Sequence, residues 1–212
     1  VRVFQAPDVC FFSLIEMLDF DDKCTSADDV AKVLSGLANM ILTSDDGHRW
    51  GRAFLDRNAG RHLCTLLKHD CSVVKREAGR LVHAICKSED KETVWSSSQL
   101  NGEDDAPSKA PRDKLRQILV EGGIIRLLVD AVGLGFVDTD CEVLAALFAI
   151  AEDIVALSHH VRHGVVDMCV TVLSSEKESS STWLLAAKLF VQISSVPKAD
   201  FVNGVDCGPA AT

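Results

Sequence analysis

Aromatic residues are scarce in this sequence. They make up 6% of its 212 residues, and tyrosine is absent. Strands of β-sandwiches and barrels depend on aromatic and β-branched side chains, so the composition argues against both architectures. No run of apolar residues approaches the roughly 18 that a membrane-spanning helix needs, and we therefore expect no direct membrane insertion.

The chain also has little basic charge for its size. Its 22 Lys and Arg residues are outnumbered by 31 Asp and Glu residues, which gives a formal net charge of −9. A protein that neutralises phosphate groups normally has the opposite balance, so nucleic acid and anionic membrane surfaces are not expected partners. The 47% of hydrophobic residues is enough for a packed core, which a disordered chain lacks.

Paired cysteines are missing, although cysteine itself is plentiful. None of the eight cysteines forms a C-x-x-C pair, and most lie within apolar runs, as in Leu63-Cys64 and Ile85-Cys86. Free cysteine behaves there as a small buried hydrophobe, and we predict a reducing compartment, the cytoplasm. Because the sequence begins with Val1 and not with methionine, we expect it to be part of a longer chain.

Motifs of catalytic and metal sites are absent as well. The sequence contains no G-x-S-x-G, G-x-x-x-x-G-K-[ST] or H-E-x-x-H motif, and no catalytic Cys–His spacing. Four residues have the types that bind zinc but lack the paired cysteines of structural zinc sites: His62, Cys64, His69 and Cys71. We therefore predict no catalytic residues, no metal and no cofactor, and we do not expect an enzyme.

What the sequence does contain is an internal repeat. Four segments share one pattern, in which apolar and polar residues precede a glycine and an apolar helix follows it. These segments are residues 54–67, 118–129, 160–173 and 200–204, with glycines at 60, 123, 164 and 204. The glycines are 63, 41 and 40 residues apart, and the last two intervals fit the roughly 40–47 residues of an α-solenoid repeat.

A second type of helix, rich in alanine, is also predicted in each repeat. The instances are residues 27–41, 72–85, 140–154 and 181–193. Within residues 74–85 the apolar positions recur three and four residues apart, which is the period of an amphipathic helix. This periodicity predicts an all-α fold.

The repeat pattern resembles the armadillo repeat. The best matches are residues 58–85 and 121–150, and Leu37-Ala38-Asn39-Met40 is similar to the Leu-x-Asn-Leu signature that ends such repeats. The resemblance implies three helices per repeat, a right-handed α-solenoid of about four armadillo-like repeats, and a concave groove lined by the third helices. It also implies that the groove binds extended peptides or partner domains.

The expected organisation is a single repeat domain over residues 1–212. The repeats are expected at about residues 1–45, 46–87, 112–155 and 156–196, with the start of another at 197–204. Residues 88–111 are polar, acidic and interrupted by prolines, and we predict a flexible insertion there.

The resemblance also indicates which residues line the groove. Importin-like members carry Trp-x-x-x-Asn pairs on their third helices, and the matching pairs here are Ser35/Asn39, Arg80/Ala84, Ala145/Ala149 and Lys188/Gln192. None contains tryptophan, which argues against recognition of a basic nuclear-import signal. Arg76, Arg80, His83 and Lys87 fall on one side of the second repeat's last helix, and with Lys188 they form a basic stripe suited to an acidic partner.

These patterns predict a protein-interaction scaffold or adaptor that binds a partner peptide or domain in its concave groove. The candidate partner-binding residues are Ser35, Asn39, Arg76, Arg80, His83, Lys188 and Gln192. The alternative is a regulatory domain on the same solenoid, acting on a small GTPase or as a chaperone cofactor.

The fold prediction can be checked by far-UV circular dichroism. The spectrum should be dominated by helix, because every apolar segment has a period of about 3.6 residues and not 2.0. A spectrum dominated by strand signal would contradict the solenoid.

Overall fold

The computed structural model describes residues 6–18, 26–56, 60–98, 115–132 and 137–195, and within these ranges it contains α-helices and no strand. The helices are α1 (Ala6–Glu16), α2 (Ala27–Thr43), α3 (Gly47–Phe54), α4 (Gly60–Leu67), α5 (Ser72–Ser98), α6 (Leu115–Glu121), α7 (Ile124–Ala131), α8 (Val137–Ala151), α9 (Ile154–Arg162), α10 (Val165–Leu173) and α11 (Ser180–Ser194). The predicted all-α fold is confirmed. In the part of the chain that the structure describes, no helix is long and apolar enough to span a bilayer.

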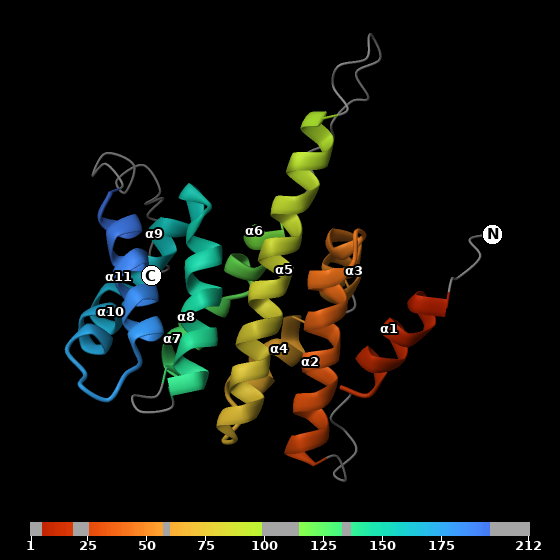
Figure 1. Cartoon of the computed structure of the whole chain (residues 1–212), viewed down its shortest axis with the longest axis horizontal. Helices are drawn as coiled ribbons and strands as arrows, with labels where there is room; N and C mark the ends of the chain where they lie inside the picture. Colours follow the sequence, from red (N-terminus) through yellow and green to blue (C-terminus); the bar gives the residue numbers. More distant parts are fainter. Residues whose placement is uncertain (1–5, 19–25, 57–59, 99–114, 133–136, 196–212) are drawn as a thin grey trace, which may run out of the picture.

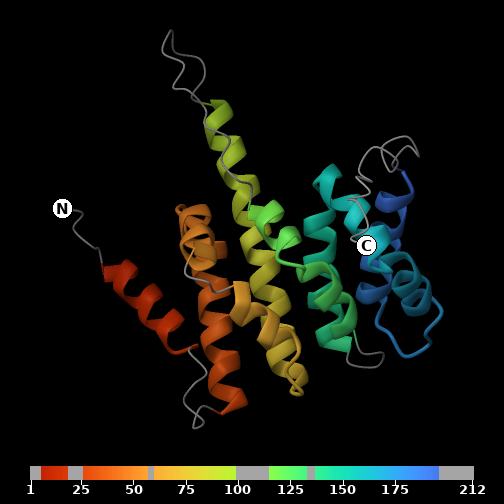
Figure 2. The same cartoon turned by 180° about the vertical axis from the view of Figure 1, so that it is seen from behind.

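The helices are arranged as stacked units of three. Two short helices and one longer helix form each unit, in the order α3–α4–α5, α6–α7–α8 and α9–α10–α11, and α1 and α2 precede them. The long helices α2, α5, α8 and α11 lie side by side across one face of the molecule (Figure 1). Seen from behind, the short helices cover the other face (Figure 2). This is the α-solenoid that the sequence predicts.

The repeated glycine has a conformational role. Gly123 and Gly164 each have φ of 75°, a left-handed conformation, and they directly precede α7 and α10. No atom lies within 4 Å of a Cβ built on either glycine, so the backbone angle and not a lack of space selects glycine. The turn between the first two helices of a unit therefore depends on this residue.

Serines begin two of the long helices. The hydroxyl oxygen of Ser26 accepts the Asp29 N–H at 3.2 Å before α2, and the hydroxyl oxygen of Ser179 accepts the Thr182 N–H at 3.2 Å before α11. Each bond satisfies a backbone donor that has no partner within its helix.

The central contact of the solenoid joins α5 and α8. A Cβ added to Gly79 of α5 would lie 3.2 Å from a methyl group of Val143 and 3.3 Å from its Cα, so the two backbones approach closely there. Around this point Leu81 and Ile85 of α5 and Leu147 of α8 are fully buried. The third helices are thus joined by continuous apolar packing.

The prediction of a flexible insertion over residues 88–111 is wrong for residues 88–98. These residues continue α5, which projects beyond the neighbouring helices (Figure 1). Ser88 and Glu89 are buried, with 1% and 8% of their surface exposed. Residues 99–111 of the predicted insertion lie outside the described residues.

A buried ionic cluster explains why this end of α5 is ordered. Arg116 of α6 forms ion pairs with Asp90 at 2.6 Å, Glu152 at 3.0 Å and Glu89 at 3.5 Å. Its Nε–H donates to the carbonyl oxygen of Ala149 at 2.9 Å, and its backbone N–H donates to Glu89 at 3.2 Å. The charged residues that the sequence suggests are solvated therefore join α5, α6 and the end of α8.

Another polar side chain inside the core is His160 of α9, which is fully buried. Its Nδ1 lies 2.8 Å from the carbonyl oxygen of Ala156, and its Nε2 lies 3.1 Å from that of Leu147 on α8. A neutral imidazole carries one N–H and donates to only one of these oxygens. Burial lowers the pKa of His160 below its ordinary 6.5, although the two carbonyl groups oppose this shift. The ring is therefore neutral at physiological pH.

Removal of the Arg116 side chain should be strongly destabilising. Arg116→Ala leaves the buried Glu89 without its cation, whereas Lys87 still pairs with Asp90 and Glu152, and breaking a buried ion pair costs about 3–5 kcal/mol of unfolding free energy. Urea denaturation measures this change. Arg126→Ala is the matched control, because Arg126 and its partner Asp130 are exposed, and it should shift stability by less than about 0.5 kcal/mol. Equal effects of the two substitutions would show that the cluster does not hold α6 in place.

The stability of the protein should also depend on pH through His160. Since its folded-state pKa is lowered, the unfolded chain binds the proton first, and stability is lost as pH falls below about 6.5. The loss of unfolding free energy caused by His160→Gln, measured in urea, should therefore be smaller at pH 5 than at pH 8. An equal loss at both pH values would contradict a buried, neutral imidazole.

Candidate functional site

One exposed or half-buried stripe runs along each long helix. Its positions are spaced four, three and four residues apart, so they lie on one side of the helix. The stripes, together called the third-helix face below, are Lys32, Gly36, Asn39 and Thr43 on α2; Arg76, Arg80, His83 and Lys87 on α5; Cys141, Ala145, Phe148 and Glu152 on α8; and Leu184, Lys188, Val191 and Ser195 at α11. Direct contacts join the stripe of α2 to that of α5, through Asn39 and Arg80, and the stripe of α5 to that of α8, through Lys87 and Glu152; α11 packs beside α8.

Arg80 connects the stripes of α2 and α5. One of its terminal nitrogens donates to the side-chain oxygen of Asn39 at 2.7 Å, and the other donates to the hydroxyl of Ser35 at 3.4 Å. The structure therefore brings three of the predicted site residues together. Ser35 itself is half-buried between the helices, so it supports Arg80 from below.

A buried carboxylate holds Arg76 and Arg80 in position. Glu77 is 8% exposed at its side chain, accepts a hydrogen bond from Nε of Arg76 at 3.0 Å and lies 3.7 Å from a terminal nitrogen of Arg80. Sequence reasoning missed Glu77, although its place beside Arg76 and three residues before Arg80 is the spacing of an ion pair on a helix. Its charge fixes both guanidinium groups at the surface.

A second carboxyl group lies near this pair, on α8. Burial raises the pKa of Glu142, and the charge of Glu77 raises it further, whereas Arg80 and Arg76 lower it. Glu142 is therefore more easily protonated than an exposed glutamate, and it offsets less of the positive charge of Arg76 and Arg80 as the pH falls.

The remaining members of the predicted basic stripe contribute less charge. Burial, followed by the nearby Lys87 ammonium, lowers the pKa of His83, so its imidazole is neutral at physiological pH. Burial alone would lower the pKa of Lys87, but its ion pairs with Glu152 at 2.9 Å and Asp90 at 3.3 Å raise it. Within the α5 stripe, the guanidinium groups of Arg76 and Arg80 are therefore the main candidates for contact with a partner.

The predicted residues on α11 lie apart from this centre. Lys188 is exposed on the third-helix face, with α8 between it and the arginines of α5. Gln192 is half-buried between α11 and α8, where its Nε2 donates to the carbonyl oxygen of Ala151 at 2.8 Å. Gln192 therefore joins two repeats and lies beside the face.

The cysteine and histidine residues considered as ligands have structural roles. Among the described residues, no group of three His, Cys, Asp or Glu side chains could hold a metal ion. His69 accepts the backbone N–H of Cys71 at 2.9 Å in the turn after α4, and the sulfur of Cys64 lies 3.9 Å from the carbonyl oxygen of Gly122. Burial raises the pKa of the Cys86 thiol to about 12. This thiol stays protonated and is a poor nucleophile.

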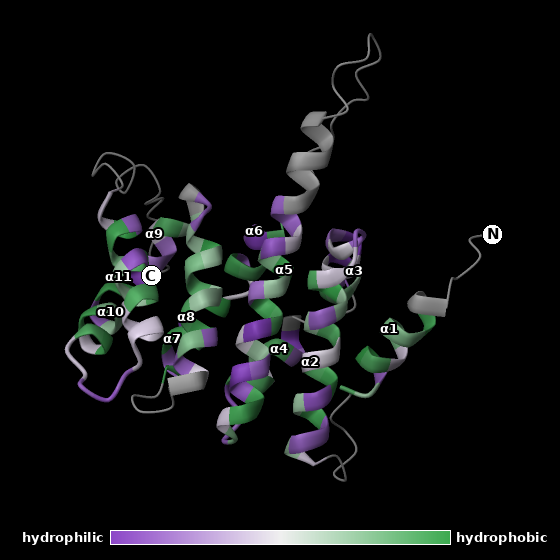
Figure 3. Cartoon of the chain, in the orientation of Figure 1, coloured by the Kyte–Doolittle hydropathy of each residue, from purple (hydrophilic) through white to green (hydrophobic). Residues whose placement is uncertain are grey.

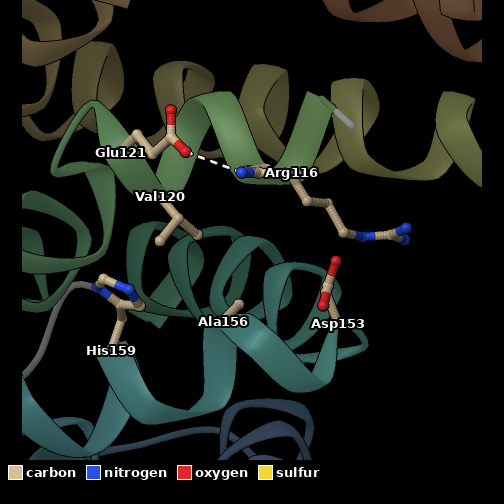
Figure 4. A pocket seen from close by; sticks show the side chains of 7 residues that line it. Arg116, Val120, Glu121, Asp153, Ala156 and His159 are labelled. Atoms are coloured by element: carbon tan, nitrogen blue, oxygen red, sulfur yellow. Dashed lines mark hydrogen bonds between the residues drawn. The ribbon is translucent and has the colours of Figure 1, made fainter. Parts of the chain in front are cut away.

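A pocket lies on the opposite side of the solenoid, between the first helices of two units. Its volume is about 190 Å³, and its lining comes from α6 and from the start of α9: Arg116, Gln117, Val120, Glu121, Asp153, Ala156 and His159. Gln117 donates to Glu121 at 2.9 Å, and the Arg116 side chain points away from His159 (Figure 4). The polar groups therefore do not converge on one point, as a catalytic site requires.

Designed proteins are among the solved structures that resemble the chain. An engineered protein (structural genomics target OR366) has a TM-score of 0.48 and 20% identity, over 92% of this chain and 86% of its own. A designed armadillo repeat protein in complex with the peptide (KR)4 has a TM-score of 0.43 and 16% identity, over 91% and 86%. Another designed armadillo repeat protein has a TM-score of 0.41 and 16% identity, over 91% and 85%. No protein-family model matches the chain, and no curated protein is similar to it in sequence.

The class of the protein follows from its own helices. It is an all-α solenoid of three-helix units, arranged as in armadillo-like repeats, and its long helices present one continuous face.

Proposed function

We propose that the chain is a protein-interaction scaffold or adaptor, not an enzyme, and that a segment of a partner protein binds across the third-helix face. The observation that carries the proposal is the alignment of four stripes on α2, α5, α8 and α11 into one surface. Such repeated surfaces suit extended ligands, because each unit adds one set of contacts.

The arginines of this face support a binding role. Arg76 and Arg80 are about one third exposed and are held by Glu77, and Arg80 is also held by Asn39. A guanidinium group has five N–H donors, and the two hydrogen bonds of Arg80 to α2 use only two of them. A side chain that is already oriented loses little conformational entropy when a ligand binds.

Charge and cysteine chemistry favour a protein partner in a reducing compartment such as the cytoplasm. The net charge of −9 disfavours nucleic acid. None of the six cysteines in the described ranges forms a disulfide, as is usual in reducing compartments.

The proposal is tested with a displayed library of random peptides. The third-helix face spans three steps between helices of about 8–10 Å each, and an extended peptide rises about 3.3 Å per residue, so about nine residues cover the face. We expect the chain to enrich specific peptides. The double substitution Leu184→Asp/Val191→Asp should weaken their binding by about tenfold or more, because it places charge where apolar contact is made.

Val170→Asp is the matched control for this test. Val170 is an exposed valine of the same repeat, but it lies on α10 and outside the third-helix face. It should leave peptide affinity unchanged, and thermal melts should show that all variants are folded. Failure to enrich any peptide, or equal binding to the double variant and the wild type, would contradict the proposed function.

A further inference from the structure

The third-helix face has two halves of different chemistry. The stripes of α2 and α5 contain polar and basic residues, whereas those of α8 and α11 are largely apolar, and Figure 3 shows the corresponding change in hydropathy from α2 and α5 to α8 and α11. On the apolar half, Leu184 and Val191 are 56% and 65% exposed, and Phe148 is half-buried. Leu184 and Val191 lie two turns apart on the same side of α11, with the exposed Lys188 between them, and exposed large apolar residues that gather on one face are a feature of binding surfaces.

The positive charge of the basic half is also localised. Arg76 and Arg80 share the buried carboxylate of Glu77, and about one third of each arginine side chain is exposed. The other nearby carboxyl group, Glu142, has a raised pKa because of its burial. Lys87 is bound to Glu152 and Asp90 and adds little. These two partly exposed guanidinium groups lie over the N-terminal third of α5, one helix away from Phe148 and two helices away from Leu184.

We propose that the partner segment combines acidic and apolar side chains: its carboxylates meet Arg76 and Arg80, and its apolar side chains cover Phe148, Leu184 and Val191. This inference rests on the proposed function and names the chemistry of the ligand. Neighbouring helices are about 8–10 Å apart, which corresponds to about three residues of an extended chain. The expected motif of the partner segment is thus an acidic residue with apolar residues about three and six positions away on one side of it.

Other ligand chemistries fit the face less well. A basic segment would place like charges opposite Arg76 and Arg80, which is unfavourable at an interface. A purely apolar segment would bury the remaining N–H donors of Arg80 without offering them an acceptor, which is costly. Carboxylates, by contrast, accept paired hydrogen bonds from arginine in a planar geometry.

The peptide library also tests this inference, through the sequences of the enriched peptides. These should contain Asp or Glu together with Leu, Ile, Val or Phe at the stated spacing. For one such peptide, replacement of its acidic residue by Gln or Asn should weaken binding to the wild-type chain about tenfold. The same replacement should have little effect on binding to Arg80→Gln, because the contact is already lost; this double-mutant cycle does not depend on how Arg80→Gln changes stability.

The outcomes separate the two proposals. Enriched peptides that lack the acidic and apolar pattern, but still lose binding to Leu184→Asp/Val191→Asp, would overturn this inference and leave the proposed function standing. Additive effects in the double-mutant cycle would also overturn it. If light scattering shows a dimer that the double substitution converts to a monomer, then a second copy of the chain covers the apolar half, and the inference fails in that case too.

Discussion

Helix α5 packs against α2 on one side and against α8 on the other, and the positions of the remaining helices follow from this double contact. Gly79 lets α8 approach closely, and the buried faces of α5 and α8 then fix the rotation of each helix about its axis. Once that rotation is fixed, the side chains on the side of each helix away from the core lie on one surface. The third-helix face is therefore a consequence of core packing.

Charge in this protein is organised by burial. An acidic chain exposes two arginines at the middle of its third-helix face because the side chain of Glu77 lies beneath them, out of solvent. Toward the C-terminal end of α5 the arrangement is reversed. There the buried Arg116 forms ion pairs with three carboxylates, two on α5 and one directly after α8. The first arrangement leaves hydrogen-bond donors of Arg80 for a ligand, whereas the second uses its cation to hold neighbouring repeats together.

Of the third-helix face, the predicted site residues include Asn39, Arg76, Arg80, His83 and Lys188; the repeat pattern predicted the solenoid, and local periodicity was sufficient to predict its helices. It failed for residues 88–98, since Glu89 and Asp90 find their partner in Arg116, which is distant in sequence and gives no periodic signal. The alignment to the armadillo pattern placed Ser35 and Gln192 on the face. A difference of one position turns a helical side chain by about 100°, and such an alignment does not resolve that angle. The bonds of Ser35 to Arg80 and of Gln192 to Ala151 depend on the packing between repeats.

The contacts between repeats also determine how the molecule responds to force. Between α5 and α8, tight backbone packing is reinforced by Arg116, so this joint resists shear and twist. Between α8 and the last unit, the polar links among the described residues include the hydrogen bond of Gln192 to the carbonyl oxygen of Ala151 and the contact of the buried His160 ring with that of Leu147. A solenoid with such unequal joints behaves as a spring that is stiff at its centre and compliant toward its last unit. Tension applied along its axis would change the curvature at α11 first, and the distance from the arginines of α5 to the apolar residues of α11 would vary with load.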